Sequence, residues 1–289
     1  MSRFELIHPA ACRLGECPVW LADVGQLLFV DVTGRRLHRF APASGTLTTV
    51  ATEEDIGFVA PARSGGFVAG LRSGVWLLED DGRKRCLLAR NPGDARTLRF
   101  NDGGIDPRGR LLIGTIDETK RDGHAGLYRL DPDGLAEVAS GLMTSNGVAF
   151  SADGRRLYHS DTPRFVIYER DYRPDTGEVG ERRIFARLDP QAADRGRPDG
   201  AAVDRGGDYW SALYEGSRVN RYDASGSLVA EYPLPVRSPT MPAFGDADLK
   251  TLYVTTAQAA DGSGGGLYAL RVEIPGLAHQ PFDDEGFQS

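Results

Sequence analysis

Three short segments of the sequence place an Asn or Asp directly before a glycine and a small apolar stretch. They read NDGGI, SNGVAF and PDGAAV, and their alignment puts Asp102, Asn146 and Asp199 at equivalent positions. A fourth segment, GECPVW, has Glu16 at the same point. Carboxylate and amide oxygens are the preferred ligands of Ca²⁺, Mg²⁺ and Mn²⁺, and Zn²⁺ and Fe²⁺ also accept them. If these segments meet in space, they predict a site for one divalent metal ion.

The elements that carry these residues belong to a motif that occurs six times along the chain. Each copy leads from β-prone residues through a turn into another strand, as in LLFVDVTGRRLHRF and RLYHSDTPRFVIYER. The copies are spaced by about 39 to 52 residues, which is the repeat length of propeller blades. We align them on their expected first strands, at Phe29, Val68, Leu112, Tyr158, Trp210 and Tyr253.

No long stretch has the apolar spacing of an amphipathic helix, so strands dominate the expected fold. The sequence therefore predicts an all-β, six-bladed β-propeller with a central metal site, in which residues 1–289 form one domain. A β-sandwich is the alternative, although sandwiches do not repeat one motif this regularly. Strand Phe4–Ile7 is expected to join the last blade, because it would cover an otherwise open sheet edge.

A propeller would bring the aligned segments together, because rotation about the central axis relates equivalent positions on its inner strands. Glu16, Asn146 and Asp199 would converge at the mouth of the central channel, with Asn101 and Asp102 nearby. Two carboxylates in a partly dehydrated channel require a cation or a proton to compensate their charge. Adjacent strand residues point to opposite sides, so Asn101 and Asp102 cannot both face the ion. We interpret Asp102 as a strand-end residue that caps backbone groups, which is also the alternative interpretation for each of the others.

Composition argues against several other classes of protein. The chain has 289 residues and a formal net charge of −7, which argues against nucleic acid as a partner. No apolar run approaches the roughly 20 residues needed to cross a bilayer, and the start of the chain lacks a signal-peptide pattern. The three cysteines have no CxxC spacing, so we expect reduced thiols and a cytoplasmic location, with no membrane partner. The sequence does not predict an oligomeric state.

Two further features are expected to have structural roles. His159 lies on an expected inner strand, and no nucleophile motif accompanies it, so we expect a hydrogen-bonded core histidine. The acidic cluster at 283–285 is expected to form a solvated tail.

The chain resembles the SMP-30/gluconolactonase/regucalcin-like family of six-bladed propellers and is similar to bacterial sugar lactonases. The resemblance covers most of the chain in order and rests on LGECPVW, LLFVD, RFNDGGIDPRGRL, SNGVAFSADGRRLYHSDT, RPDGAAVDRGGDYWSAL and LKTLYVTTA. It implies that Glu16, Asn146 and Asp199 hold one divalent metal ion. It also implies that Asn101 lies beside this ion and that Arg99 contacts the substrate.

Two positions depart from the family pattern or fit it loosely. The residue after the metal-binding Glu is commonly Gly or Ser in such proteins, whereas this chain has Cys17. The acidic substrate contact of the family corresponds to Asp117 or Glu118, and we favour Glu118.

The resemblance implies a metal-dependent lactonase that opens a sugar lactone, such as gluconolactone or a pentonolactone, to the free sugar acid. In this hypothesis the ion polarises the lactone carbonyl, and Asp199 acts as a general base as well as a ligand. Arg99, Asn101 and Glu118 would bind the sugar. Two alternatives stay open: a phosphotriesterase-like hydrolase that uses the same ion, and a non-catalytic propeller that binds metal or a partner.

Overall fold

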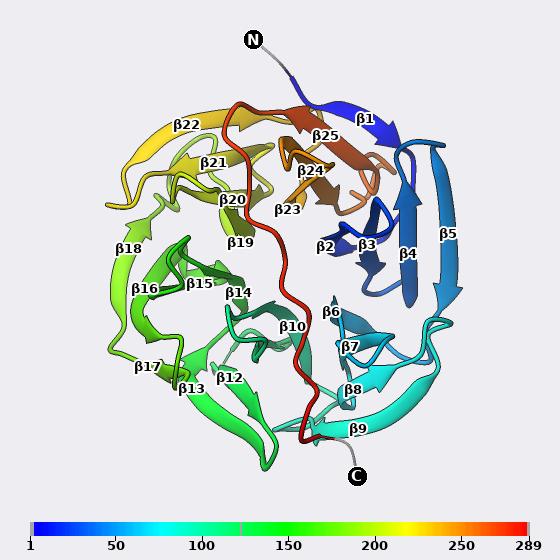
Figure 1. The fold of residues 1–289 in the computed structure, drawn as a ribbon. Helices are drawn as coiled ribbons and strands as arrows, with labels where there is room; N and C mark the ends of the chain where they lie inside the picture. The colour runs from blue at the N-terminus through cyan, green and yellow to red at the C-terminus, as the bar shows by residue number, and fades with distance from the viewer. Residues whose placement is uncertain (1–2, 122, 288–289) are drawn as a thin grey trace.

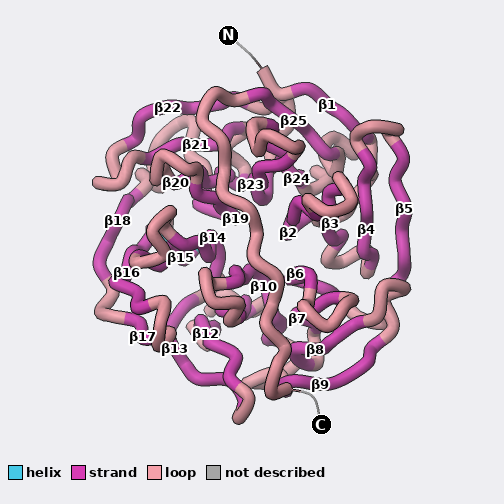
Figure 2. The backbone as a smooth tube through the Cα atoms, viewed as in Figure 1, coloured by secondary structure: helices cyan, strands magenta, loops and turns pink. Residues whose placement is uncertain are grey.

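Six antiparallel sheets arranged in a ring make up the part of the chain that the computed structural model describes, residues 3–121 and 123–287 (Figures 1 and 2). Each sheet is built from consecutive strands that step outwards from the central axis. Contacts between the innermost strands of neighbouring sheets close the ring in the order β2, β6, β10, β14, β19 and β23. The prediction of an all-β, six-bladed propeller is confirmed.

The strands take equivalent places in the six sheets. The innermost strands are β2 (Gly15–Leu21), β6 (Ile56–Pro61), β10 (Leu98–Ile105), β14 (Ser145–Phe150), β19 (Arg197–Val203) and β23 (Pro239–Gly245). The second strands are β3 (Gln26–Asp31), β7 (Phe67–Leu71), β11 (Leu111–Asp117), β15 (Arg156–Asp161), β20 (Tyr209–Tyr214) and β24 (Thr251–Thr256). The third strands are β4 (Arg36–Ala41), β8 (Gly74–Leu78), β12 (Ala125–Asp131), β16 (Val166–Arg173), β21 (Arg218–Tyr222) and β25 (Leu267–Arg271). The outer strands are β5 (Thr46–Ala51), β9 (Lys84–Arg90), β13 (Gly134–Leu142), β17 (Glu178–Val179) with β18 (Arg183–Arg187), β22 (Leu228–Pro233) and β1 (Glu5–His8).

The six residues on which the repeats were aligned lie on the second strand of each sheet. Our expectation that they mark first, inner strands was therefore wrong by one strand. The innermost strands are the upstream segments that contain GECPVW, NDGGI, SNGVAF and PDGAAV, so the Asx residues lie directly on the channel wall. Burial explains the ambiguity, because first and second strands alike are packed between neighbouring sheets and are buried along almost their whole length, as in β14 and β15.

All six innermost strands have a register irregularity against the second strand of their sheet. The shifts fall between Glu16 and Val19, Ile56 and Phe58, Phe100 and Gly103, Asn146 and Ala149, Pro198 and Ala201, and Pro239 and Met241. A bulge turns the strand locally and redirects the side chains beside it, which is why bulges are common next to binding sites.

Strand β1 completes the last sheet by pairing with β25, and Leu6 lies opposite Tyr268. The prediction that the N-terminal strand joins the last blade is confirmed. Phe4, just before β1, is buried against the sixth sheet, whereas Leu6 is 52% exposed. The closing strand is therefore held both by its ladder and by one buried aromatic ring.

Replacing Phe4 with alanine should lower the free energy of unfolding by about 3–5 kcal/mol, because a buried aromatic side chain is lost from the core. Deletion of the first eight residues should be more damaging, since it also exposes the edge of β25. Thermal and urea unfolding would measure both effects. The Leu6→Ala variant serves as the control and should stay within about 0.5 kcal/mol of wild type. Equal stability of the Phe4 variant and wild type would contradict this account of closure.

The chain ends in a segment that crosses the channel mouth from the sixth sheet towards the second and third (Figure 1). One end is bonded through Gly276, whose N–H donates to the Leu249 carbonyl at 2.8 Å, and the other through Phe282, whose N–H donates to the Pro61 carbonyl at 2.8 Å. Asp284 is 2% exposed and accepts hydrogen bonds from the backbone and hydroxyl of Ser64. The expectation of a solvated tail was wrong. We call residues 276–284 the C-terminal strap.

The part of the chain that the structure describes contains no helix with the length and apolarity needed to cross a membrane. Its one helix is a short 3₁₀ turn, η1 (Thr162–Arg164).

Candidate functional site

The candidate residues lie near the beginnings of four innermost strands. Glu16 is on β2, Asn101 is on β10, Asn146 is on β14 and Asp199 is on β19. The C-terminal strap, in contrast, is bonded to residues at or after the ends of innermost strands, including Arg63 after β6, whose N–H donates to the Phe282 carbonyl. The candidate site therefore faces the channel mouth opposite the strap.

A chain of hydrogen bonds links these side chains across three sheets. The Asn146 amide nitrogen donates to Asp199 Oδ1 at 2.6 Å, and the Asn101 amide nitrogen donates to Asn146 Oδ1 at 2.8 Å. Arg99 Nη1 donates in turn to Asn101 Oδ1 at 2.8 Å. Thr162 also accepts from the Asn146 amide at 2.9 Å and donates to the Pro198 carbonyl at 2.7 Å. The Asn146 amide is thus fixed by neighbours on both sides.

Burial and nearby negative charges oppose ionisation of both carboxylates of the candidate metal set. Burial in the channel raises the pKa of Glu16 well above its usual value, and the negative charges of Asp199 and Asp102 raise it further. Burial likewise raises the pKa of Asp199 well above its usual value, followed by the charge of Asp102, with Arg197 opposing the change. This electrostatic arrangement favours either protonation or a bound cation.

Asp102 has a different role from its neighbour Asn101. Its Oδ1 accepts from the Gly103 N–H at 2.8 Å, and its Oδ2 accepts from the Val148 N–H at 2.9 Å. Burial raises its pKa to about 7, although these backbone N–H groups oppose the increase. Asp102 therefore ties β10 to β14 next to Asn146, in agreement with its interpretation as a backbone cap.

Two residues at the bulges have positive φ angles. Gly147 has a φ of 61°, and a Cβ atom there would lie 2.3 Å from the Tyr209 hydroxyl, so a side chain has no room. Cys17 has a φ of 48°, in the left-handed region that favours glycine. Its thiol is buried and exchanges hydrogen bonds of 3.3 Å with the backbone N–H and carbonyl of Val59. Burial raises the pKa of this thiol, so Cys17 packs the channel wall as a neutral group.

Glu118 and Asp117 have different hydrogen-bond partners and therefore different roles. Asp117 accepts from the backbone and hydroxyl of Thr119 and from the backbone of His124, so it shapes the loop. Glu118 is held by both terminal nitrogens of Arg72, at 2.8 and 3.0 Å, and its Oε1 lies 3.4 Å from Arg99 Nε. Burial would raise the pKa of Glu118, but hydrogen bonding to Arg72 and the two positive charges outweigh it and lower the pKa. This geometry favours Glu118 over Asp117 as the acidic residue of the site.

Sequence reasoning missed several residues that border the site. Arg72 donates to Asp55 at 2.6 Å as well as to Glu118, and so connects the second sheet with the third. Tyr214 has its pKa raised by burial and then by the charge of Asp199, which places its phenol near the carboxylates.

The repeat itself contained a signal for these missed residues. Arg72, Thr162 and Tyr214 each lie four residues after the aligned residue of their repeat, and Glu118 lies six residues after Leu112. All four are found at the end of the second strand or just after it. The side chains at this place differ from one sheet to the next, so residue type does not reveal that the four residues take similar places around the axis.

His159 lies on the second strand β15, fully buried and away from these residues. Its Nε2 accepts from Arg170 Nε at 3.3 Å, and burial lowers the pKa of its imidazole to about 3. The expectation of a hydrogen-bonded core histidine is confirmed, with the difference that the strand is not innermost.

The donor set determines what kind of cation would fit. Within residues 3–121 and 123–287, no three His, Cys, Asp or Glu side chains are grouped to hold a metal ion. A cation at this mouth would therefore need an amide oxygen in addition to carboxylates. Asn146 carries one, Oδ1, which accepts from the Asn101 amide, while its amide nitrogen donates to Asp199. Oxygen donors of this kind fit a hard divalent ion.

Comparison with known proteins assigns the family. The family model described as the SMP-30/gluconolactonase/LRE-like region matches residues 14–258. A 6-deoxy-6-sulfogluconolactonase of Pseudomonas putida is 42% identical over 93% of this chain and 94% of its own length. A pentonolactonase of Haloferax volcanii is 37% identical over 88% of this chain and 86% of its own length.

A solved structure agrees with this assignment. The calcium-binding protein regucalcin of Agrobacterium tumefaciens superposes with a TM-score of 0.89 at 26% identity, covering 96% of each chain. Together, the matched family model and the relatives above 30% identity show that the chain belongs to the SMP-30/gluconolactonase/LRE-like family.

Proposed function

We propose that the protein hydrolyses an aldonolactone, a cyclic ester of a sugar acid, with one divalent cation bound at the channel mouth. The observation that carries this proposal is the meeting of two charge-strained carboxylates with a fixed amide at one mouth of the channel. The names of the similar proteins, which include a sulfogluconolactonase and a pentonolactonase, support a sugar lactone as the substrate class. The structural similarity to the calcium-binding regucalcin of Agrobacterium tumefaciens supports a divalent ion.

Glu16, Asn146 and Asp199 would hold the cation, which when bound polarises the lactone carbonyl. Asp199 would take the proton of the attacking water as the new carbon–oxygen bond forms. As the ring carbon–oxygen bond breaks, that proton would pass to the leaving ring oxygen. The hydrogen bond from Asn146 keeps the Asp199 carboxylate oriented for this transfer.

Arg99, Asn101 and Glu118 would bind the hydroxyl groups of the sugar. Arg99 is 5% exposed, and its Nε has no hydrogen-bond partner among the described residues, so a donor remains available in the buried wall of the site. A buried donor without a partner is costly, and a substrate oxygen would satisfy it. Glu118 offers an acceptor beside it.

The direct experiment is a lactone panel with chelator-treated protein to which single divalent ions are returned. We expect hydrolysis of at least one aldonolactone to depend on the added ion. Full turnover of the metal-free protein would overturn the role of the cation. Absence of turnover with every ion would favour a non-catalytic propeller, and a preference for paraoxon over all lactones would favour a phosphotriesterase.

Arg72 is expected to act as a positioning residue for Glu118, because it holds both carboxylate oxygens. In Arg72→Gln, KM for the lactone should rise about tenfold, equivalent to the ~1.4 kcal/mol of a charged hydrogen bond, while kcat changes little. Steady-state kinetics would separate the two parameters. The matched control is Arg83→Gln, which removes an exposed pair with Asp81. A fall in kcat at constant KM would contradict the positioning role.

We also propose that residues 1–289 act as one domain in the cytoplasm. Both ends of the described chain are tied to the ring, through β1 at one end and the C-terminal strap at the other. The three cysteines are free thiols, as a reducing compartment would keep them.

A further inference from the structure

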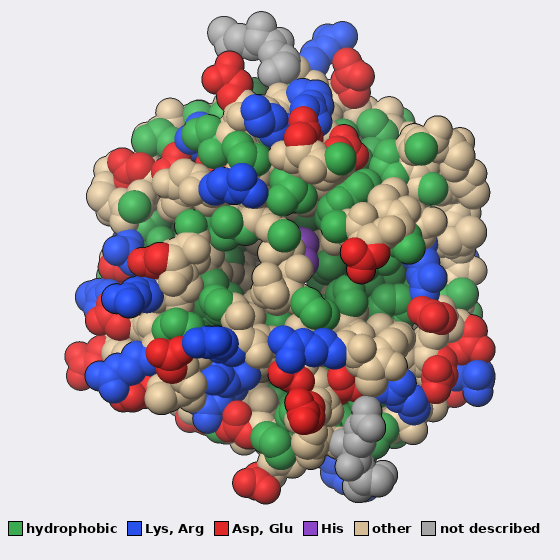
Figure 3. Space-filling view, in the orientation of Figure 1, with side chains coloured by type: hydrophobic (Ala, Val, Ile, Leu, Met, Phe, Trp, Pro, Cys, Tyr) green, Lys and Arg blue, Asp and Glu red, His purple; other side chains and the backbone are tan. Residues whose placement is uncertain are grey.

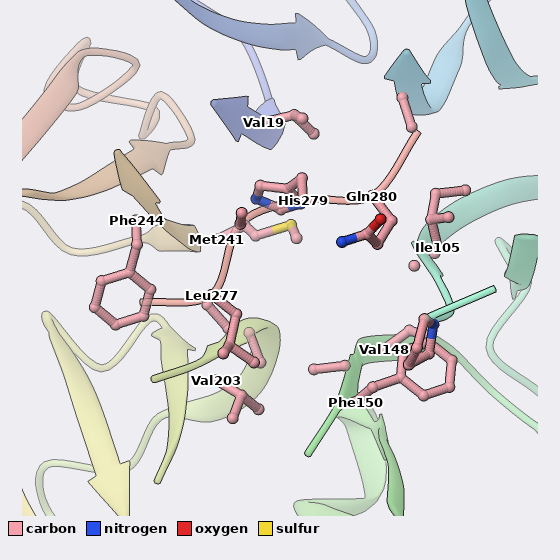
Figure 4. A pocket seen from close by; sticks show the side chains of 18 of the residues that line it. Val19, Ile105, Val148, Phe150, Val203, Met241, Phe244, Leu277, His279 and Gln280 are labelled. Atoms are coloured by element: carbon pink, nitrogen blue, oxygen red, sulfur yellow. The ribbon is translucent and has the colours of Figure 1, made fainter. Parts of the chain in front are cut away.

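A cavity of about 330 Å³ occupies the central channel on the side of the C-terminal strap. Its walls are mostly apolar and come from innermost strands and from the strap, and they include Val19, Val148, Val203 and Leu277 (Figure 4). The space-filling view shows hydrophobic side chains around a hollow at the centre of this face (Figure 3). The size falls within the range of small-molecule sites, which starts at about 300 Å³.

This cavity is distinct from the candidate site. Its lining residues follow the candidate ligands along the innermost strands: Cys17 comes after Glu16, and Ala201 comes two residues after Asp199. Cys17 is fixed to the Val59 backbone and so forms part of the layer between the two spaces. A polyhydroxylated sugar would leave its hydroxyl groups without partners against such apolar walls.

Two polar side chains of the strap converge on the cavity. His279 and Gln280 are exposed to this space and point into it (Figure 4). Among the described residues, neither side chain has a hydrogen-bond partner, and no backbone hydrogen bond holds the strap between Gly276 and Phe282. The strap thus carries a donor and an acceptor over an otherwise apolar space without using them for its own folding.

We propose that the cavity is a second binding site, for a small uncharged molecule with an apolar body and one hydrogen-bonding group. The apolar body would fill the channel between Val19, Val203 and Val148, and the polar group would bond to His279 and Gln280. No Asp, Glu, Lys or Arg side chain is among the described residues that line the cavity, so its wall carries no carboxylate, ammonium or guanidinium charge. A neutral wall favours an alcohol or phenol over a carboxylate.

The probe for this site is 2-naphthol, with naphthalene as its matched partner without a hydroxyl group. Titration of the intact protein should show one saturable site, with 2-naphthol bound about tenfold more tightly than naphthalene, as one or two net hydrogen bonds provide. The double variant His279→Ala/Gln280→Ala should remove this tenfold advantage and leave naphthalene binding unchanged. His279→Gln should retain most of it.

Further controls show whether the probes bind in this cavity or at the candidate site. Val203→Phe should block both probes by filling the cavity, with folding checked by thermal unfolding. Saturating gluconolactone should not displace 2-naphthol. The proposal is overturned by the absence of saturable binding, by an unchanged 2-naphthol affinity in the double variant, or by competition from the lactone.

Discussion

Replacing Asp199 with asparagine is expected to reduce kcat for lactone hydrolysis by about 10²- to 10⁴-fold, which is the usual contribution of a positioned general base. The substitution keeps the shape of the side chain, so the Asn146 amide retains an oxygen at the distance of its present 2.6 Å hydrogen bond. It removes the group that would accept the proton of water and also one charged donor to the cation. Steady-state kinetics at saturating metal and lactone would measure the loss.

The matched control is Asp223→Asn, which alters an exposed turn where Asp223 bonds to Ser225. This variant should hydrolyse lactone at the wild-type rate. Circular dichroism and thermal unfolding would show that the Asp199 variant is folded. Retention of more than a tenth of wild-type kcat would exclude Asp199 as the general base.

Replacing Glu16 with glutamine is expected to have opposite effects on activity and on stability. Activity at limiting metal should fall at least about a hundredfold, because a charged ligand is lost. The metal-free protein should become more stable, because burial and the charges of Asp199 and Asp102 oppose ionisation of Glu16. Metal titration and urea unfolding after chelation would measure the two effects.

The stability gain should depend on pH in a defined direction. When folding raises the pKa of a carboxyl group, the group does not destabilise the folded state at a pH below its ordinary pKa, which is near 4.5 for Glu16. The penalty grows as pH rises from there towards the pKa in the folded protein, and then stays constant. The advantage of Glu16→Gln over wild type should therefore be absent at low pH and largest at neutral pH. The control Glu137→Gln, at an exposed residue of the outer strand β13, should show no such trend, and a pH-independent gain would contradict the mechanism.

The sequence was sufficient to predict the ring, because each repeat encodes the same strand and turn pattern regardless of its neighbours. It was not sufficient to tell which strand of each repeat is innermost, because a circular repeat has no intrinsic beginning and the first two strands of a sheet are both buried. The candidate ligands could be named because Asn146 and Asp199 each precede a glycine in aligned repeats, and Glu16 lies at the same point of the GECPVW segment. Their metal-binding and catalytic roles stay predictions.

Two parts of the molecule lay beyond sequence reasoning for physical reasons. The C-terminal strap has no periodic pattern, and the contact between Asp284 and Ser64 joins residues 220 positions apart. Arg72 and Tyr214 border the site from different sheets, and neither has a characteristic motif. Such contacts follow from the closed ring and can be read only after the register of each sheet is known.

The arrangement of strands also separates two kinds of evolutionary change. The oxygen-rich centre is built on innermost strands, where bulges, close glycine contacts and burial leave almost no latitude for substitution. The residues at the ends of the second strands, Arg72, Glu118, Thr162 and Tyr214, lead directly into surface loops that tolerate insertion and exchange. We therefore expect proteins that share this scaffold to differ in the lactone that they accept at these loops, while the residues proposed to hold the cation stay unchanged on the innermost strands.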